Sequence, residues 1–408
     1  MERLDKVYNE FLILNALKNE EKMSIVSIAA KNGISRPTVD AVIHQMEKSG
    51  IVIQDGYAKS YSGRKPVLWK LNGNSGFFVG IDLEPPVVRI IVLNICKEEI
   101  FADAVVFEKF EPDFVVEKLS RLIKDVFRVH LRAELDNLQS ISIGNPGNID
   151  NCHGISVSLH GCPDWENVPL TELLQDQFAC PIFLENVTLF MANSERERAV
   201  RAGHKDYVYI ALRTGVGAGI CINGELFHGS KGNAGHFGFL PLSNPLFTEG
   251  RSLEECSDGV VILNRMKEYG LIGQDENKTV SMTTEYLNLF TDKVAENNEY
   301  ARSILDEIAD YWAYGISSTF CLLDIPLYII GGTFSYINQR SPDVGNFFLE
   351  QIKKYCLSKY LPNKSPVFDL EFAKRINYAA ALGGALFGYE KFFIKSNILL
   401  HEYMHRKI

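Results

Sequence analysis

The first fifty residues place apolar side chains at helical spacing in three successive segments. Helices are predicted over residues 6–17, 24–32 and 35–48, with a serine at the start of the second and third helices and Gly33 ending the second. The apolar positions of the third helix are Val39, Val42, Ile43 and Met46. They form one buried stripe, so the polar residues at the start of this helix face outward.

A capped helix, a glycine turn and a second helix with an outward polar face are typical of a helix-turn-helix, whose second helix enters the DNA major groove. An ordinary helical hairpin is the alternative that this pattern leaves open. The residues expected to contact DNA from the second of these helices are Ser35, Arg36, Pro37, Thr38, Asp40, His44 and Gln45. Lys31 and Lys48 are expected to contact phosphate groups of the DNA backbone.

Two further segments, residues 51–54 and 67–71, predict a two-stranded wing with a turn near residues 55–57. Between the strands lies a Gly-Arg-Lys-Pro stretch that contains Arg64 and Lys65. Such a stretch is extended, slim and cationic, which suits insertion into a narrow A·T-rich minor groove. A solvated loop is the alternative interpretation.

The pattern changes to α/β after a turn-rich hinge at residues 72–76. Strands are predicted at 77–83, 87–93, 104–110 and 140–144, with a helix at 114–131. A similar order restarts with strands at 207–212 and 218–224, helices from 252 to 323, a strand at 327–330 and a small-residue helix at 377–393. The repeat predicts a duplicated lobe with a ligand-binding cleft.

The predicted domains are therefore a winged helix-turn-helix over residues 1–72 and an α/β domain over 73–408. Within the second domain, lobe one is expected over 76–200 together with the C-terminal helix, and lobe two over 201–375.

Charge and cysteine content refine this picture. The chain has a net charge of −9, which divides into +3 for residues 1–72 and −12 for the rest, as expected for a basic DNA-binding head on an acidic body. Its eight cysteines form no Cys-x-x-Cys pair, which predicts reduced thiols. The charged N-terminus is no signal peptide, and no apolar run approaches the roughly 18 residues that span a bilayer. A cytoplasmic protein without membrane contact is expected.

Six motifs follow one another in an order that carries a family resemblance. After the winged helix they are Gly80-Ile81-Asp82, Gly144-Asn145-Pro146-Gly147, Leu184-Glu185-Asn186, Thr214-Gly215-Val216-Gly217-Ala218-Gly219, Ala234-Gly235-His236-Phe237-Gly238 and Ile329-Ile330-Gly331-Gly332. This series resembles the ROK family (repressors, open reading frames and kinases), and within it the xylose- and N-acetylglucosamine-responsive type of repressor. The resemblance covers nearly the whole chain. It implies a two-lobed sugar-kinase/actin-like (ribonuclease H-like) domain, a sugar effector in the cleft, and a homodimer or homotetramer.

The positions that carry catalysis in the kinases of this family differ here. The resemblance implies Glu-Asn-Asp, whose Asp deprotonates the sugar hydroxyl, where this chain has Glu185-Asn186-Val187. Valine accepts no proton, so general-base catalysis is not expected. The phosphate-binding Gly-Gly-Thr turn is replaced by Glu84-Pro85-Pro86, which removes two N–H donors and adds a carboxylate. Residues 214–217 either hold a phosphate or form a tight strand connection.

The sugar-binding positions implied by the resemblance are altered too. The Asn expected before the family's Trp is Gly161, and the family's Glu-x-Gly-His run reads His236-Phe237-Gly238-Phe239. Because hydroxyl partners are lost, the effector is expected to be an unusual ligand with an anionic or aromatic part, or to be absent. His236 is either a ligand contact or a packed histidine. The candidate effector-binding residues are Gly147, Gly161, Glu185, Asn186, Val187, Gly235 and His236.

The structural zinc that the resemblance implies is not expected either. Its cysteine run corresponds to residues 248–256, which retain only Cys256, and Phe239 stands in place of the histidine ligand. Phe239, Leu240 and Leu253 are expected to stabilise this segment by packing instead. No metal, no cofactor and no catalytic residue is therefore predicted.

The sequence predicts a DNA-binding transcriptional regulator, a repressor of carbohydrate-related genes, with a catalytically inactive kinase-like domain. Its expected partners are a double-stranded DNA operator, a sugar or sugar-derivative effector, and a second copy of the chain. Two alternatives stay open: a sugar kinase with a fused regulatory head, and a constitutive DNA-binding protein that has no effector.

Overall fold

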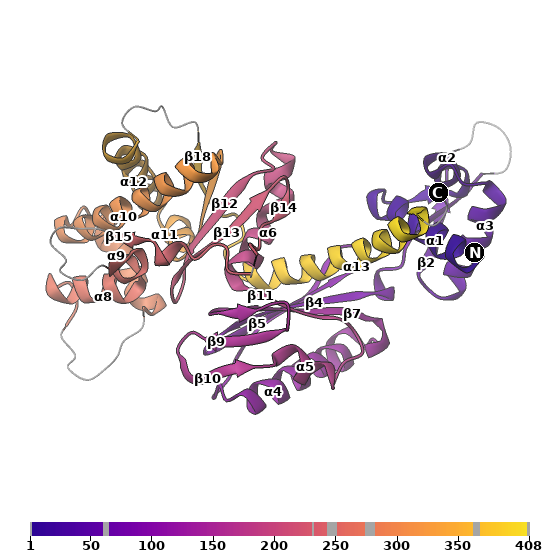
Figure 1. Cartoon of the computed structure of the whole chain (residues 1–408), viewed down its shortest axis with the longest axis horizontal. Helices are drawn as coiled ribbons and strands as arrows, with labels where there is room; N and C mark the ends of the chain where they lie inside the picture. The colour runs from indigo at the N-terminus through magenta and orange to yellow at the C-terminus, as the bar shows by residue number, and fades with distance from the viewer. Residues whose placement is uncertain are drawn as a thin grey trace. The chain divides into compact units, whose positions relative to one another are not determined.

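The computed structural model describes residues 2–59, 65–230, 232–242, 251–273, 282–361 and 368–405, with side chains from residue 7 to residue 393 (Figure 1). The chain forms two compact units. The first comprises Met1–Ile143, Val168–Leu184 and Gly384–Ile408, and the second Gly144–Asn167 and Glu185–Gly383. This division differs from the predicted lobes, because residues 144–167 and 185–200 lie in the second unit and the boundary at residue 72 does not separate units.

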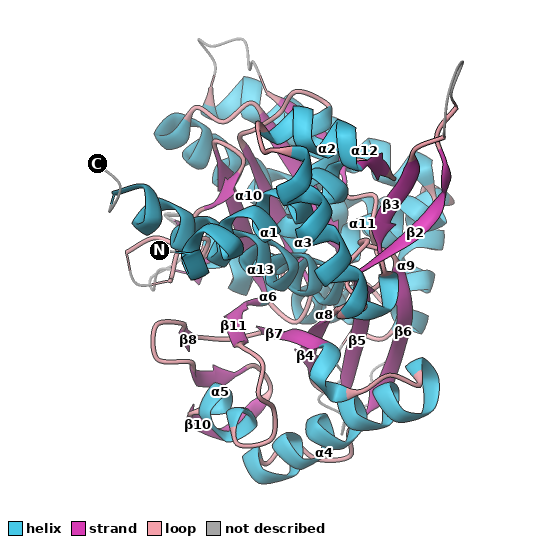
Figure 2. Cartoon of the chain, turned by 90° about the vertical axis from the view of Figure 1, so that its right-hand side faces the viewer, coloured by secondary structure: helices cyan, strands magenta, loops and turns pink. Residues whose placement is uncertain are grey.

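The N-terminal head is a winged helix-turn-helix, as the sequence predicts. Its elements are α1 (Glu2–Asn19), β1 (Met23–Ser24), α2 (Ile25–Asn32), α3 (Arg36–Lys48), β2 (Val52–Tyr57) and β3 (Val67–Leu71). The three strands form one sheet in the order β1-β3-β2, and Figure 2 shows β2 and β3 as a hairpin beside the helices. Gly33 ends α2 at a φ of 65°, a left-handed conformation that glycine adopts without strain.

The first unit is built around a five-stranded sheet in the order β11-β7-β4-β5-β6. Its strands are β4 (Phe77–Glu84), β5 (Val87–Asn94), β6 (Glu99–Val106), β7 (Leu138–Asn145) and β11 (Ile182–Asn186). The helices of this unit include α4 (Pro112–Asp125), a π-helical turn (Val126–Leu131), α5 (Leu170–Gln175) and much of α13 (Ala379–His405). Two adjacent residues of β4 show that helices cover both faces: Phe77 packs edge-on against Phe127 and Phe78 against Tyr389 of α13.

The predicted strand at 104–110 is wrong in position, because the strand is β6, Glu99–Val106. A tight turn accounts for the shift. The Asn94 Oδ1 atom accepts hydrogen bonds from the backbone N–H groups of Cys96 and Glu98, at 2.9 and 3.0 Å. This side-chain-to-backbone turn reverses the chain directly after β5 and brings Glu99 opposite Leu93.

The second unit contains a second five-stranded sheet in the order β14-β13-β12-β17-β18. Its strands are β12 (Tyr207–Leu212), β13 (Val216–Ile222), β14 (Glu225–Leu226), β17 (Leu327–Gly332) and β18 (Asp369–Phe372). The surrounding helices are α6 (Val187–Arg201), α7 (Leu253–Ser257), α8 (Gly259–Glu268), α9 (Thr284–Ala295), α10 (Glu299–Leu323), α11 (Thr333–Arg340) and α12 (Pro342–Tyr355). Two small sheets also belong to it, formed by β8 (Ile149–Asp150), β9 (Ile155–Leu159) and β10 (Cys162–Val168), and by β15 (Pro241–Leu242) and β16 (Arg251–Ser252).

Alternate residues of β12 contact opposite layers of the second unit. Val208 and Ile210 are fully buried in one hydrophobic cluster with Trp312 of α10. Tyr207 faces the other way and donates a hydrogen bond from its hydroxyl to the Ala192 carbonyl of α6 at 2.8 Å. The sheet is therefore covered by helices on both faces, the arrangement that the α/β pattern predicts. Within the part of the chain described here, no helix has the length and apolarity needed to cross a membrane.

Candidate DNA-binding surface and ligand pocket

The first turn of α3 is fixed by its own serine cap. The Ser35 Oγ atom accepts a hydrogen bond from the Thr38 N–H at 3.3 Å and lies 2.7 Å from the Thr38 hydroxyl. Pro37 occupies the first turn, where its missing N–H costs nothing. Ser35 and Thr38 thus hold the helix start, and this leaves Arg36 and Asp40 as exposed polar side chains of the first two turns.

The next two candidates, His44 and Gln45, are exposed but already contact the protein. The His44 ring lies edge-on to the buried Trp69, and its Nδ1 atom is 3.1 Å from Glu47 Oε2. Gln45 donates to Glu10 Oε1 of α1 at 3.2 Å. Hydrogen bonding from His44 lowers the pKa of Glu47. His44 or Gln45 would have to break one of these contacts before it could bind a base, whereas Arg36 would not.

The cationic candidates of the head also include residues that already contact the protein and residues that are exposed. Lys31 forms an ion pair with Glu20 at 3.0 Å, while Lys48 is exposed at the end of α3. At the base of the wing, Asp55 lies 3.2 Å from Lys22 and 3.4 Å from Lys70, and the hydrogen bond from Lys22 lowers the Asp55 pKa. Of the two wing candidates, Lys65 is exposed and Arg64 lies outside the described residues.

A pocket of about 720 Å³ lies within the second unit, along β9, β10 and the segments that flank them. Two of the predicted effector residues, Gly147 and Gly161, line it. Gly147 has a φ of 146°, and a Cβ atom there would lie 2.3 Å from the Ser158 carbonyl oxygen, so only glycine fits. Gly161 has a φ of 79° and open space where a side chain would be.

Asn186 and Val187 hold the start of α6 and are not among the residues that line this pocket. The Asn186 Oδ1 atom caps α6 by accepting from the Thr188 N–H at 2.9 Å, and its Nδ2 atom donates to the Gly147 carbonyl at 3.5 Å. Val187 is 7% exposed. Asn186 therefore positions the Gly147 loop, and Val187 fills space at the helix start.

Glu185 is buried and likewise contacts protein groups instead of lining the pocket. Its Oε1 atom accepts a hydrogen bond from Asn151 Nδ2 at 3.2 Å and lies 3.2 Å from His228 Nδ1. This arrangement fixes the segment before α6. The structure therefore brings Gly147 and Gly161 together at one pocket. Glu185, Asn186 and Val187 do not line this pocket, and Asn186 bonds to the Gly147 carbonyl.

Phe239 was expected to stabilise its segment by packing. It does stack on a neighbouring ring, but 60% of its surface is exposed and it lines the pocket. The His236 ring stacks on it at a centroid distance of 5.0 Å and an angle of 3°. Leu253, by contrast, is fully buried, as predicted. Gly235 has a φ of 95° and passes so close to the Ala218 carbonyl that a Cβ atom would lie 2.0 Å from it.

The Thr-Gly-Val-Gly segment at 214–217 covers the end of the tight turn between β12 and β13 and the first two residues of β13. This is the strand connection that the sequence left open as one of two interpretations. Glu254, at the start of α7, accepts a hydrogen bond from the Val216 N–H at 2.7 Å. A backbone N–H that would serve a phosphate is thus already bound to a carboxylate. No local motif marks Glu254, because its partner is 38 residues away along the chain.

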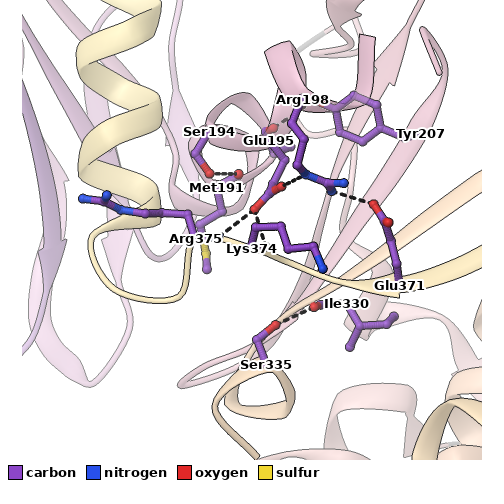
Figure 3. A network of polar contacts seen from close by, with 11 residues as sticks. Met191, Ser194, Glu195, Arg198, Tyr207, Ile330, Ser335, Glu371, Lys374 and Arg375 are labelled. Carbon is purple, nitrogen blue, oxygen red and sulfur yellow. Dashed lines mark hydrogen bonds and ion pairs between the residues drawn. The ribbon is translucent and has the colours of Figure 1, made fainter. Parts of the chain in front are cut away.

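A polar network centred on the buried Glu195 ties α6 to β18 and to the segment before α13 (Figure 3). Glu195, 2% exposed, accepts hydrogen bonds from the backbone N–H groups of Lys374 and Arg375 at 2.7 and 2.9 Å. Its second oxygen accepts from Arg198 Nε at 2.6 Å, and Arg198 also donates to Glu371 at 2.5 Å. Each oxygen of the Glu195 carboxylate is therefore satisfied without a ligand.

Comparison with known proteins agrees with this architecture. The sequence model of the ROK family matches residues 107–390, and that of a winged helix-turn-helix DNA-binding domain matches residues 8–53. The chain belongs to the ROK family. Among its curated relatives is a xylose repressor of Caldicellulosiruptor bescii, 25% identical over 93% of this chain and 94% of the relative. A glucokinase of Thermotoga maritima is 24% identical over 69% of this chain and 90% of the enzyme.

The solved structures show the same fold. A ROK family transcriptional regulator described as a homologue of the E. coli MLC protein superposes with a TM-score of 0.74 at 18% identity, and the match covers 98% of each chain. A ROK glucokinase from Streptomyces griseus, solved with glucose and AMPPNP, matches 76% of this chain and 99% of its own length with a TM-score of 0.62 at 18% identity. The kinase thus matches a smaller share of this chain than the regulator does.

Proposed function

We propose that this ROK family member is a DNA-binding repressor of carbohydrate-related genes, whose ROK domain binds a small effector. The observation that carries the proposal is the capped helix α3, with Arg36 and Asp40 exposed on its first two turns, in a winged helix attached to a ROK domain. The xylose repressor that shares 25% identity along nearly all of this chain supports the same role.

The proposed mechanism places two copies of the chain on one operator. Their α3 helices enter successive major grooves, roughly 34 Å apart, and Arg64 and Lys65 of each wing enter the adjoining minor groove. Arg36, Thr38, Asp40, His44 and Gln45 are the proposed base contacts, and Lys31 and Lys48 the proposed phosphate contacts. An effector that binds one arrangement of the two heads more tightly shifts the population toward it and so changes DNA affinity.

The experiment that tests this proposal is selection of bound fragments from the source organism's genomic DNA. The control is the double variant Arg36→Ala/Arg64→Ala, which keeps the cap at Ser35. We expect the native chain to enrich a short pseudo-palindromic site and the variant to lose it. If both proteins recover the same unenriched fragments, the proposed DNA-binding role is wrong.

A sugar kinase is the second candidate, favoured only by the likeness to glucokinases. Against it stand Val187, which cannot act as a base, and Glu254, whose carboxylate occupies the Val216 N–H. We expect no sugar-dependent ADP formation from the purified chain, and none after Val187→Asp, because Glu254 still blocks the glycine turn. A coupled ADP assay with a panel of hexoses and pentoses measures this, with an active ROK glucokinase as positive control. Sugar-dependent turnover by the native chain would establish the kinase.

A further inference from the structure

The charge, the aromatic surface and the volume of the pocket beside Phe239 favour one class of effector over others. We propose that it binds an uncharged glycoside of more than one ring, such as a neutral disaccharide, with one ring stacked on Phe239. The inference rests on the proposed function in taking the ligand to be a carbohydrate. It goes further by excluding sugar phosphates and sugar acids and by assigning the stacking residue.

The charge of the pocket argues against anionic ligands. Among the described residues that line it, none is lysine or arginine, and the acidic residue Glu166 is exposed at its surface. A phosphate or carboxylate group placed there would meet this negative charge, and no described lining residue is a lysine or arginine that could offset it. Burial raises the pKa of the lining Cys162 thiol, so this group adds no charge that would attract a cation.

The aromatic surface argues for a ring with an apolar face. Phe239 is held by a short 3-10 turn, in which its N–H donates to the His236 carbonyl at 3.1 Å. The His236 ring covers one face of Phe239, and the phenyl group is still 60% exposed. An aromatic face carries partial negative charge and attracts the C–H groups of a stacked ring. The C–H face of a pyranose supplies such groups and leaves its hydroxyls at the rim.

The polar groups around this aromatic surface are mostly neutral. Asn148, His160 and Asn167 are exposed side chains that both donate and accept hydrogen bonds, and the peptide at Gly161 has no side chain above it. The Ser158 hydroxyl already accepts from the Asn148 N–H at 3.1 Å. Amide and imidazole groups pair with hydroxyls without a net charge, which is the requirement for binding a neutral sugar.

The size of the pocket favours more than one ring. Its volume of about 720 Å³ falls in the upper part of the roughly 300–1,000 Å³ range of sites that enclose drug-sized molecules. A single pentose or hexose would fill only part of this volume, so a ligand of more than one ring matches it better.

Isothermal titration of the full chain tests the proposal. The probes are xylose, xylobiose, xylotriose and cellobiose as neutral sugars, with xylonate and glucose 6-phosphate as anions. We expect at least one neutral oligosaccharide to bind more tightly than any monosaccharide or anion. Phe239→Ala should weaken that binding roughly three- to tenfold, and Phe239→Trp should preserve it. Phe227→Ala, at a 44% exposed phenylalanine of the same unit that does not line the pocket, should change nothing.

Three results would overturn the proposal: binding of an anion in preference to every neutral sugar, no binding of any neutral oligosaccharide, or equal affinity of the native chain and Phe239→Ala. The results distinguish a failure of this effector proposal from a failure of the proposed DNA-binding function. If genomic selection yields an operator but no neutral oligosaccharide binds, the regulator stands and the effector class is wrong. If an oligosaccharide binds at Phe239 but no operator is found, the pocket stands and the DNA-binding role fails.

Discussion

Replacing Arg36 by alanine is expected to weaken binding to the selected operator by about ten- to a hundredfold, the range for loss of one well-placed base contact. The exposed guanidinium stands on the first turn of α3, the turn that enters the major groove in this fold. The substitution leaves the Ser35–Thr38 cap and the buried stripe of α3 intact, so the head should stay folded. Fluorescence anisotropy on operator and scrambled DNA at one fixed salt concentration measures the change.

Lys48→Ala is the matched control, because this cation lies on the last turn of the same helix. We expect it to weaken operator and scrambled DNA alike and to reduce the slope of log affinity against log salt by about 1, as for loss of one phosphate contact. Arg36→Ala should instead lower the ratio of operator to scrambled affinity. An equal loss on both DNAs after Arg36→Ala would show that this residue contacts only the backbone.

The winged-helix head could be predicted from sequence because its signals are local. Ser24 and Ser35 cap α2 and α3 through residues three positions away, and Gly33 ends α2 with a single positive φ. The stripe of α3 needs only the helical period. The family resemblance and the two-lobed fold were also within reach, because their motifs are short and keep their order along the chain.

The pocket beside Phe239 was harder to predict because distant segments form it. Phe239 was predicted to be a lost zinc position with a packing role. Its stacking on His236 and its exposure to solvent depend on the local 3-10 turn, which the sequence does not reveal. Glu254 binds a backbone group 38 residues away, and no short motif records such a pair. The two compact units also depend on distant segments, since residues 144–167 leave the first unit and the chain returns to it at Val168.

Glu195→Ala is expected to lower the free energy of unfolding by roughly 3 kcal/mol, toward the lower end of the range for breaking a buried ion pair. The carboxylate is 2% exposed and satisfies the N–H groups of Lys374 and Arg375 as well as Arg198. Alanine leaves these donors without their acceptor. The effect stays below the maximum because Arg198 is partly exposed and keeps its bond to Glu371.

Glu197→Ala is the matched control, since this residue lies on the same helix and pairs with Arg201 at the surface. An exposed pair of this kind contributes only about 0.3–0.5 kcal/mol. Urea unfolding, followed separately by far-ultraviolet circular dichroism and by tryptophan fluorescence, should therefore show a large shift in midpoint for Glu195→Ala and almost none for Glu197→Ala. Similar shifts for the two variants would mean that the Glu195 network adds no more than a surface ion pair.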